Sequence, residues 1–83
     1  MSDTRTFVAY GFATTHDALT GEQLLDVLGV GYATIPAPRA LGAPCGIALR
    51  VIMEEATAAE AAFTMGGLAW TGRVEFEDRT PGR

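Results

Sequence analysis

Cys45 is the residue of this sequence best suited to chemistry, because a thiolate is a strong nucleophile that attacks electrophiles. It is the only cysteine among the 83 residues, which excludes a CxxC metal or redox site within the chain. Every basic residue is an arginine, which excludes a lysine Schiff base and a P-loop lysine. We therefore expect chemistry on a single thiol, with no metal and no cofactor.

Two further residues, His16 and Arg39, are candidates for activating this thiol, since an imidazolium or guanidinium nearby favours the thiolate. Each of the three also has an ordinary interpretation. A lone cysteine is often a small buried hydrophobic residue, a histidine at a helix start is often a surface residue, and a loop arginine is often a solvated charge. Only a fold that brings them together would favour the chemical interpretation.

The pattern of apolar residues predicts four strands and two helices in the order βαββαβ. Thr14, followed three residues later by Asp17, has the form of a capping box and predicts the start of the first helix, which Gly29 should end. The second helix is predicted over 54–65, and the strands over 7–12, 32–35, 46–52 and 69–77.

This order is typical of the α+β ferredoxin-like split βαβ fold, a four-stranded antiparallel sheet with two helices on one face and strand order 4-1-3-2. We expect one domain over 1–83, with a core of about 7–77 and a frayed tail at 78–83. The turn at 14–17 and the loop at 38–45 should then share one edge of the sheet. Strand alternation counted back from Ile47 directs Cys45 to the helix-covered side, near the start of the first helix.

Composition narrows the class of protein further. A net charge of −4 argues against a nucleic-acid partner, although the segment 32–52 has two arginines and no acid and is locally positive. No signal-peptide run and no membrane-spanning stretch is present, and with one unpaired cysteine this predicts a cytoplasmic location without a membrane partner. A chain of this length buries only about 60% of its unfolded surface, so a deep catalytic cavity is not expected.

Three motifs together resemble a small bacterial family of selenium/sulfur carrier-like proteins: THDAL at 15–19, IPAPR at 35–39 and CGIALR at 45–50. The resemblance runs from about residue 7 to residue 76. It implies that Cys45 is the carrier thiol and that the chain is a carrier more than a turnover enzyme. Family members commonly have serines before this cysteine, where this chain has Gly42-Ala43-Pro44 and therefore lacks those hydroxyls.

The resemblance also implies two partners, a sulfur or selenium donor of the cysteine-desulfurase type and an acceptor protein. The alternative is a non-catalytic interaction or regulatory module, in which the 35–39 loop and the sheet face bearing Arg50 bind a partner and Cys45 is packed and inert. An exposed edge strand would also allow a homodimer by sheet extension. Copper delivery is disfavoured by the missing CxxC, and acylphosphatase-like hydrolysis by the absence of asparagine.

Overall fold

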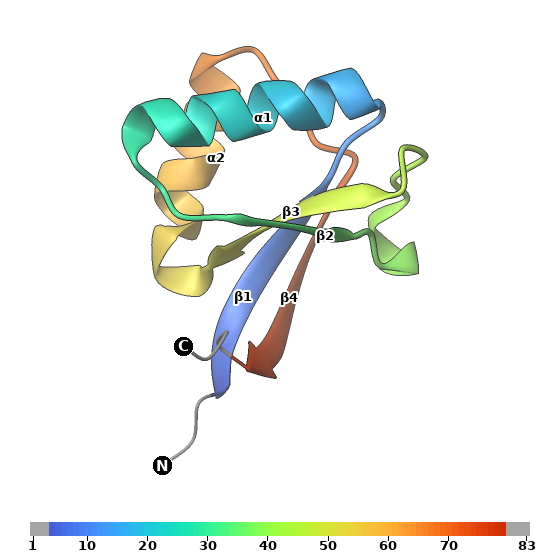
Figure 1. Cartoon of the computed structure of the whole chain (residues 1–83), viewed down its shortest axis with the longest axis vertical. Helices are drawn as coiled ribbons and strands as arrows, with labels where there is room; N and C mark the ends of the chain where they lie inside the picture. Colours follow the sequence, from blue (N-terminus) through green and yellow to red (C-terminus); the bar gives the residue numbers. More distant parts are fainter. Residues whose placement is uncertain (1–3, 80–83) are drawn as a thin grey trace.

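The computed structural model describes residues 4–79, which form one four-stranded sheet with two helices packed on one of its faces (Figure 1). All strand pairs are antiparallel and the sheet order is β2-β3-β1-β4, so the predicted fold class and strand order are confirmed. The strands are β1 (Thr4–Gly11), β2 (Ala33–Pro36), β3 (Ile47–Ile52) and β4 (Gly72–Arg79). The helices are α1 (Thr15–Leu28) and α2 (Ala56–Met65), and two 3₁₀ turns are η1 (Arg39–Leu41) and η2 (Met53–Glu55).

The β1–β4 pair differs most from the predicted bounds. Its antiparallel register runs from Thr4 opposite Arg79 to Gly11 opposite Gly72, so the sheet extends beyond the predicted core of 7–77 at both ends. Residues 78 and 79, where the tail was predicted to begin, belong to β4, and residues 80–83 lie outside the described residues. β4 also begins three residues later than predicted, because Trp70 instead packs its ring against the core aromatics.

Helix α1 begins and ends where the sequence predicts. The Thr14 hydroxyl accepts a hydrogen bond of 3.0 Å from the Asp17 N–H, and Gly29 takes the left-handed conformation (φ 73°) that closes the last turn. Leu28, the last residue of this helix, is exposed. Val30, directly after the Gly29 turn, is the buried residue at this end of the helix instead.

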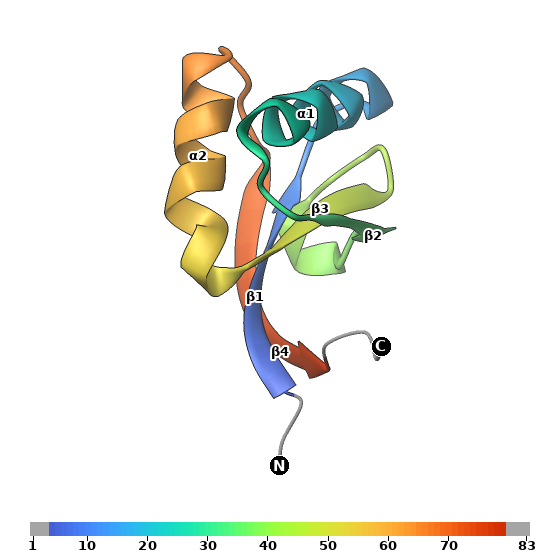
Figure 2. The same cartoon turned by 60° about the vertical axis from the view of Figure 1, so that its left-hand side comes forward.

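The main core lies between the sheet and the helices (Figure 2). Tyr10 of β1 and Phe12, directly after this strand, are fully buried there, and both meet the ring of Phe63 from α2 edge to face at centroid distances of 5.3 and 5.5 Å. Ala18, Gly21 and Leu25 of α1 complete this layer from the other helix. Helix packing of this kind fixes where α1 begins relative to the end of β1.

A smaller apolar cluster covers the opposite face of the sheet. Leu41 of η1 is buried against Ala9 of β1 and Ala48 of β3, and Thr71 donates a hydrogen bond of 3.1 Å to the Leu41 carbonyl. Gly72 permits this approach, since a Cβ atom there would lie 2.5 Å from the Leu41 carbonyl oxygen. The loop between β2 and β3 therefore folds back under the sheet, on the side away from the helices (Figures 1 and 2).

Candidate functional site

Cys45 lies in the loop that joins β2 to β3. The Ala37 N–H donates to the Gly46 carbonyl at 2.9 Å, which continues the strand ladder by one step and leaves 38–45 as the loop proper. A β-turn then ends the loop, because the Gly46 N–H donates back to the Ala43 carbonyl at 3.1 Å. Pro44 presets the first turn angle and Gly46 takes a positive φ of 79°, so the backbone of Cys45 is well fixed.

The thiol of Cys45 points back toward the sheet and is half-buried. Its Sγ atom lies 3.3 Å from the carbonyl oxygen of Phe12 and 3.5 Å from that of Ile47. Phe12 is two residues before the cap residue Thr14, so the thiol lies at the edge of the sheet where α1 begins. This is the edge at which the predicted topology places the cysteine.

The two carbonyl contacts define the chemical state that this conformation suits. A neutral thiol has one proton, which either carbonyl oxygen accepts. A thiolate or a persulfide sulfur has no proton to donate and would face two carbonyl oxygens. Exchange chemistry therefore requires Cys45 to rotate its side chain toward solvent, a motion that ordinary rotamer exchange allows for a partly exposed residue.

His16 and Arg39 lie on the surface, in the first turn of α1 and at the start of η1. Within residues 4–79, no hydrogen bond or ion pair joins either side chain to Cys45. Their role in activating the thiol stays a prediction.

Neither a metal site nor a membrane span is found in the described part of the chain. No group of three or more histidine, cysteine, aspartate or glutamate side chains there could hold a metal ion. No helix among residues 4–79 has the length and apolar character needed to cross a membrane.

Comparison with known families then places the chain. The model of the family described as "Putative Se/S carrier protein-like" matches residues 10–75. The chain belongs to this family. No curated protein and no solved structure matches the chain.

The family match spans both helices and the loop that carries the thiol. Cys45, His16 and Arg39 all lie within it, as do the three sequence motifs by which the resemblance was identified. This family is therefore the one that the three sequence motifs predicted.

Sequence reasoning missed the contacts that hold the loop in place. Leu41 is 1% exposed and anchors η1 under the sheet, although it reads in the sequence as an ordinary loop leucine. A signal was available in Gly11 and Gly72, because a glycine in a strand often marks a close backbone approach. The Phe12 carbonyl, as a main-chain group, leaves no signal in the residue types.

Proposed function

We propose that this protein is a sulfur or selenium carrier that holds the atom on Cys45 as a persulfide or selenopersulfide and transfers it to a partner protein. Membership of the Se/S carrier-like family, over residues 10–75, is the observation that carries the proposal. Cys45 is the only cysteine in the chain, so it is the only thiol that could bind the sulfur or selenium atom that the family is presumed to carry.

The proposed loading step is an exchange between two sulfur atoms without net oxidation. The Cys45 thiolate attacks the terminal sulfur of a donor persulfide, forming the new S–S bond of the Cys45 persulfide. The donor's S–S bond breaks, and its cysteine leaves as a thiolate that takes up the proton released by Cys45. Delivery repeats the exchange, with an acceptor nucleophile attacking the terminal sulfur and Cys45 as the leaving group.

The structure of the loop supports a carrier whose thiol is reached by partner proteins at the edge of the sheet. The Ala43–Gly46 turn fixes the backbone at Cys45, so that only the side chain has to rotate from Phe12 toward a partner. A donor of the cysteine-desulfurase type and a separate acceptor would each approach this edge of the sheet. The cost of the rotation is the weak hydrogen bond of the thiol, and the exchange itself only replaces one S–S bond by another.

Loading by a donor tests the proposal directly. We expect that a cysteine desulfurase with cysteine adds one sulfur atom to the protein, detected by intact mass, and that Cys45→Ser abolishes the adduct. The serine variant keeps the shape of the side chain and a hydrogen for Phe12, so its fold serves as the matched control. If no adduct forms under conditions that load another sulfur carrier, the proposal is wrong for sulfur, and a selenium donor is tested in the same way.

An interaction module with an inert cysteine is the second candidate, because the thiol is half-buried and makes two carbonyl contacts. The rate of alkylation separates the two functions. A carrier thiol reacts in the native protein at a rate close to that of a free thiol, whereas a packed thiol reacts only on unfolding.

The same assay tests the two proposed activating residues. We expect His16→Gln and Arg39→Gln each to slow native alkylation of Cys45 several-fold, because each removes a positive charge or proton acceptor from the surroundings of the thiolate. Both residues are exposed, so the fold should be unchanged in circular dichroism. Equal rates in the wild-type protein and both variants would remove His16 and Arg39 from the site.

A further inference from the structure

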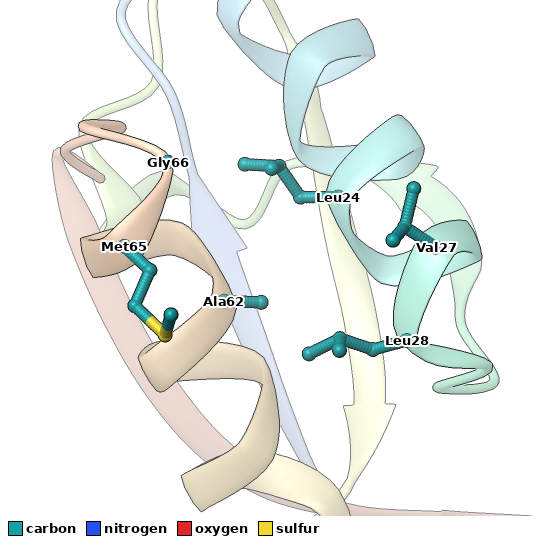
Figure 3. A pocket seen from close by; sticks show the side chains of 6 residues that line it. All are labelled: Leu24, Val27, Leu28, Ala62, Met65 and Gly66. Carbon is teal, nitrogen blue, oxygen red and sulfur yellow. The ribbon is translucent and has the colours of Figure 1, made fainter.

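The hollows on the surface of this fold differ in what they offer a ligand. The groove between α1 and α2, across which side chains of the two helices face one another, is lined by apolar residues alone (Figure 3). A second hollow, of about 300 Å³, is lined by Phe7, Gly31, Tyr32, Ala33, Arg50 and Ile52. Arg50 gives this hollow a charged group in its wall, so it can select a ligand by charge as well as by shape.

The Arg50 hollow lies on the face of the sheet away from the helices, at the end of β3. Arg50 and Ile52 are two residues apart on β3 and therefore point to the same face. On the neighbouring strands, Ala33 lies opposite Arg50 and Phe7 lies opposite Ile52. Cys45 precedes the other end of β3, separated from Arg50 by a stretch of chain that spans roughly 16 Å when extended. The hollow is therefore separate from the carrier thiol.

The guanidinium of Arg50 is buried without the hydrogen bonds that burial normally requires. The side chain is 13% exposed, its Cζ atom lies 4.2 Å from the centre of the Phe7 ring, and no described residue accepts a hydrogen bond from its Nε. The ion pair from Nη1 to the Asp78 carboxylate measures 3.6 Å, which is longer than a hydrogen bond. Buried donors in native proteins are nearly always hydrogen-bonded, so this guanidinium is a group that a bound anion would complete.

Two carboxylates adjoin the hollow but do not line it. Asp78 faces the guanidinium from β4, and because its side chain is 52% exposed, solvent weakens its attraction for Arg50. Asp26 of α1 accepts a hydrogen bond of 3.3 Å from the Tyr32 hydroxyl. The hollow therefore suits an anion of single charge, since a dianion would add repulsion from both carboxylates.

We propose that the Arg50 hollow binds a small organic acid, with the carboxylate on the guanidinium and an aromatic or branched apolar body against Tyr32 and Ile52. The planar guanidinium matches the two oxygens of a carboxylate and binds them with two parallel hydrogen bonds. Because Nε is shielded in the structure, the guanidinium turns on the Phe7 ring to present it, and the ligand replaces Asp78 as its partner.

Four small ligands test the proposal on the ¹⁵N-labelled full chain. Benzoate should shift the amide signals of 31–33 and 50–52 saturably, with a dissociation constant on the order of 1 mM for a ligand of this size. Benzamide, its neutral analogue, should bind at least tenfold more weakly, and so should inorganic phosphate. Acetate, which has the carboxylate of an acidic side chain without an apolar body, should also bind at least tenfold more weakly. Equal binding of acetate and benzoate would assign the hollow to a carboxylate of a partner protein and overturn the proposal.

Substitutions at the guanidinium locate the contact. Arg50→Met, which still covers Phe7, should weaken benzoate binding at least tenfold. Arg50→Lys, which keeps the charge but loses the planar fork, should weaken it at least threefold. Asp78→Asn should bind benzoate at least twofold more tightly, because it removes the competing carboxylate.

Two control variants separate this site from the rest of the molecule. Arg73→Gln removes an arginine that faces α2 on the other side of the sheet, and Cys45→Ser removes the carrier thiol. Both should bind benzoate as the wild type does, so failure of the carrier function would leave this result unchanged. Absence of saturable shifts, shifts centred elsewhere, equal binding of benzoate and benzamide, or wild-type affinity in Arg50→Met would each overturn the proposal.

Discussion

At the scale of single residues, Glu60 joins three elements of the fold through one carboxylate. Its Oε2 atom accepts hydrogen bonds of 2.7 Å from the Tyr10 hydroxyl of β1 and from the Arg73 Nε of β4, while Glu60 itself is on α2. Arg73 also donates to Glu75 at 2.8 Å. The hydrogen bond from Tyr10, with that from Arg73, lowers the pKa of Glu60, and burial together with this carboxylate raises the pKa of Tyr10.

The lowered pKa of Glu60 predicts a loss of stability in acid. A carboxylate whose pKa is lower in the folded state than in the unfolded chain stabilises the fold above its unfolded pKa, and this contribution is lost as the pH falls through the folded pKa. We therefore expect the urea midpoint to be steady above about pH 5 and to fall below about pH 4. Glu60→Gln should be less stable at pH 7 and flatten this acid limb, whereas Glu54→Gln, at an exposed position, should leave the limb as it is.

Arg50 lies on the face of the sheet away from the helices, and the favourable and unfavourable contributions of its contacts to the free energy of unfolding nearly cancel. Its guanidinium carbon lies 4.2 Å from the centre of the Phe7 ring, and its Nη1 lies 3.6 Å from an Asp78 carboxylate oxygen. Its Nε is buried, and none of the residues that the structure describes offers it a hydrogen-bond acceptor. The ring contact contributes about 0.5–2 kcal/mol and the loose ion pair up to about 1 kcal/mol, whereas an unsatisfied buried donor costs about 1–3 kcal/mol.

Replacement of Arg50 by a hydrophobic residue of similar length should therefore change the free energy of unfolding only slightly. We expect Arg50→Met to keep the free energy of unfolding within about 1 kcal/mol of the wild type, because the methionine still covers Phe7 and no longer buries a free N–H. Arg50→Ala, which uncovers the ring, should lose more. A loss above about 3 kcal/mol in Arg50→Met, measured by urea unfolding, would mean that the guanidinium is a net stabilising group.

At the scale of elements, the loop between β2 and β3 depends on one anchor, Leu41. Leu41→Ala should lower the free energy of unfolding by about 2 kcal/mol, near the low end for a buried leucine, because a loop can relax around the lost contacts. The same change should speed alkylation of Cys45, since the anchor helps to hold the thiol against Phe12. Leu19→Ala, at a half-exposed site on α1, should change neither quantity. A lower free energy of unfolding without faster alkylation would show that Leu41 does not help to hold the Cys45 thiol in place.

Much of the fold could be predicted because its local signals agree. Thr14, Asp17 and Gly29 mark the ends of α1 by cap chemistry that depends only on neighbouring residues, and the four strands alternate or form apolar runs. The burial of Val30 after α1 and the start of β4 were less predictable, because Val30 and Trp70 reach the core by tertiary packing that no local pattern encodes. For the site, topology predicted the edge at which Cys45 lies, but not the main-chain carbonyl that its thiol meets.

At the scale of the whole molecule, the two edges of the sheet decide whether copies can join by sheet extension. β2 is only four residues long and ends at Pro36, which has no N–H to offer a neighbouring strand. β4 is longer, but Arg73, Glu75 and Glu77 are exposed along it. Short edges, proline and charge are the features by which natural sheets avoid edge pairing. We therefore expect a monomer.

Removal of charge from β4 should convert this edge into a pairing surface. Glu75→Val with Glu77→Val makes the strand apolar and β-branched along its exposed positions, so we expect concentration-dependent dimers in sedimentation velocity and slower hydrogen exchange of the β4 amides. The control Glu54→Gln with Glu55→Gln also removes two negative charges, but from η2, and should stay monomeric. This control separates edge pairing from a general loss of charge repulsion. A wild-type protein that is already dimeric at micromolar concentration, with its β4 amides protected, would show that the edge charges do not prevent sheet extension.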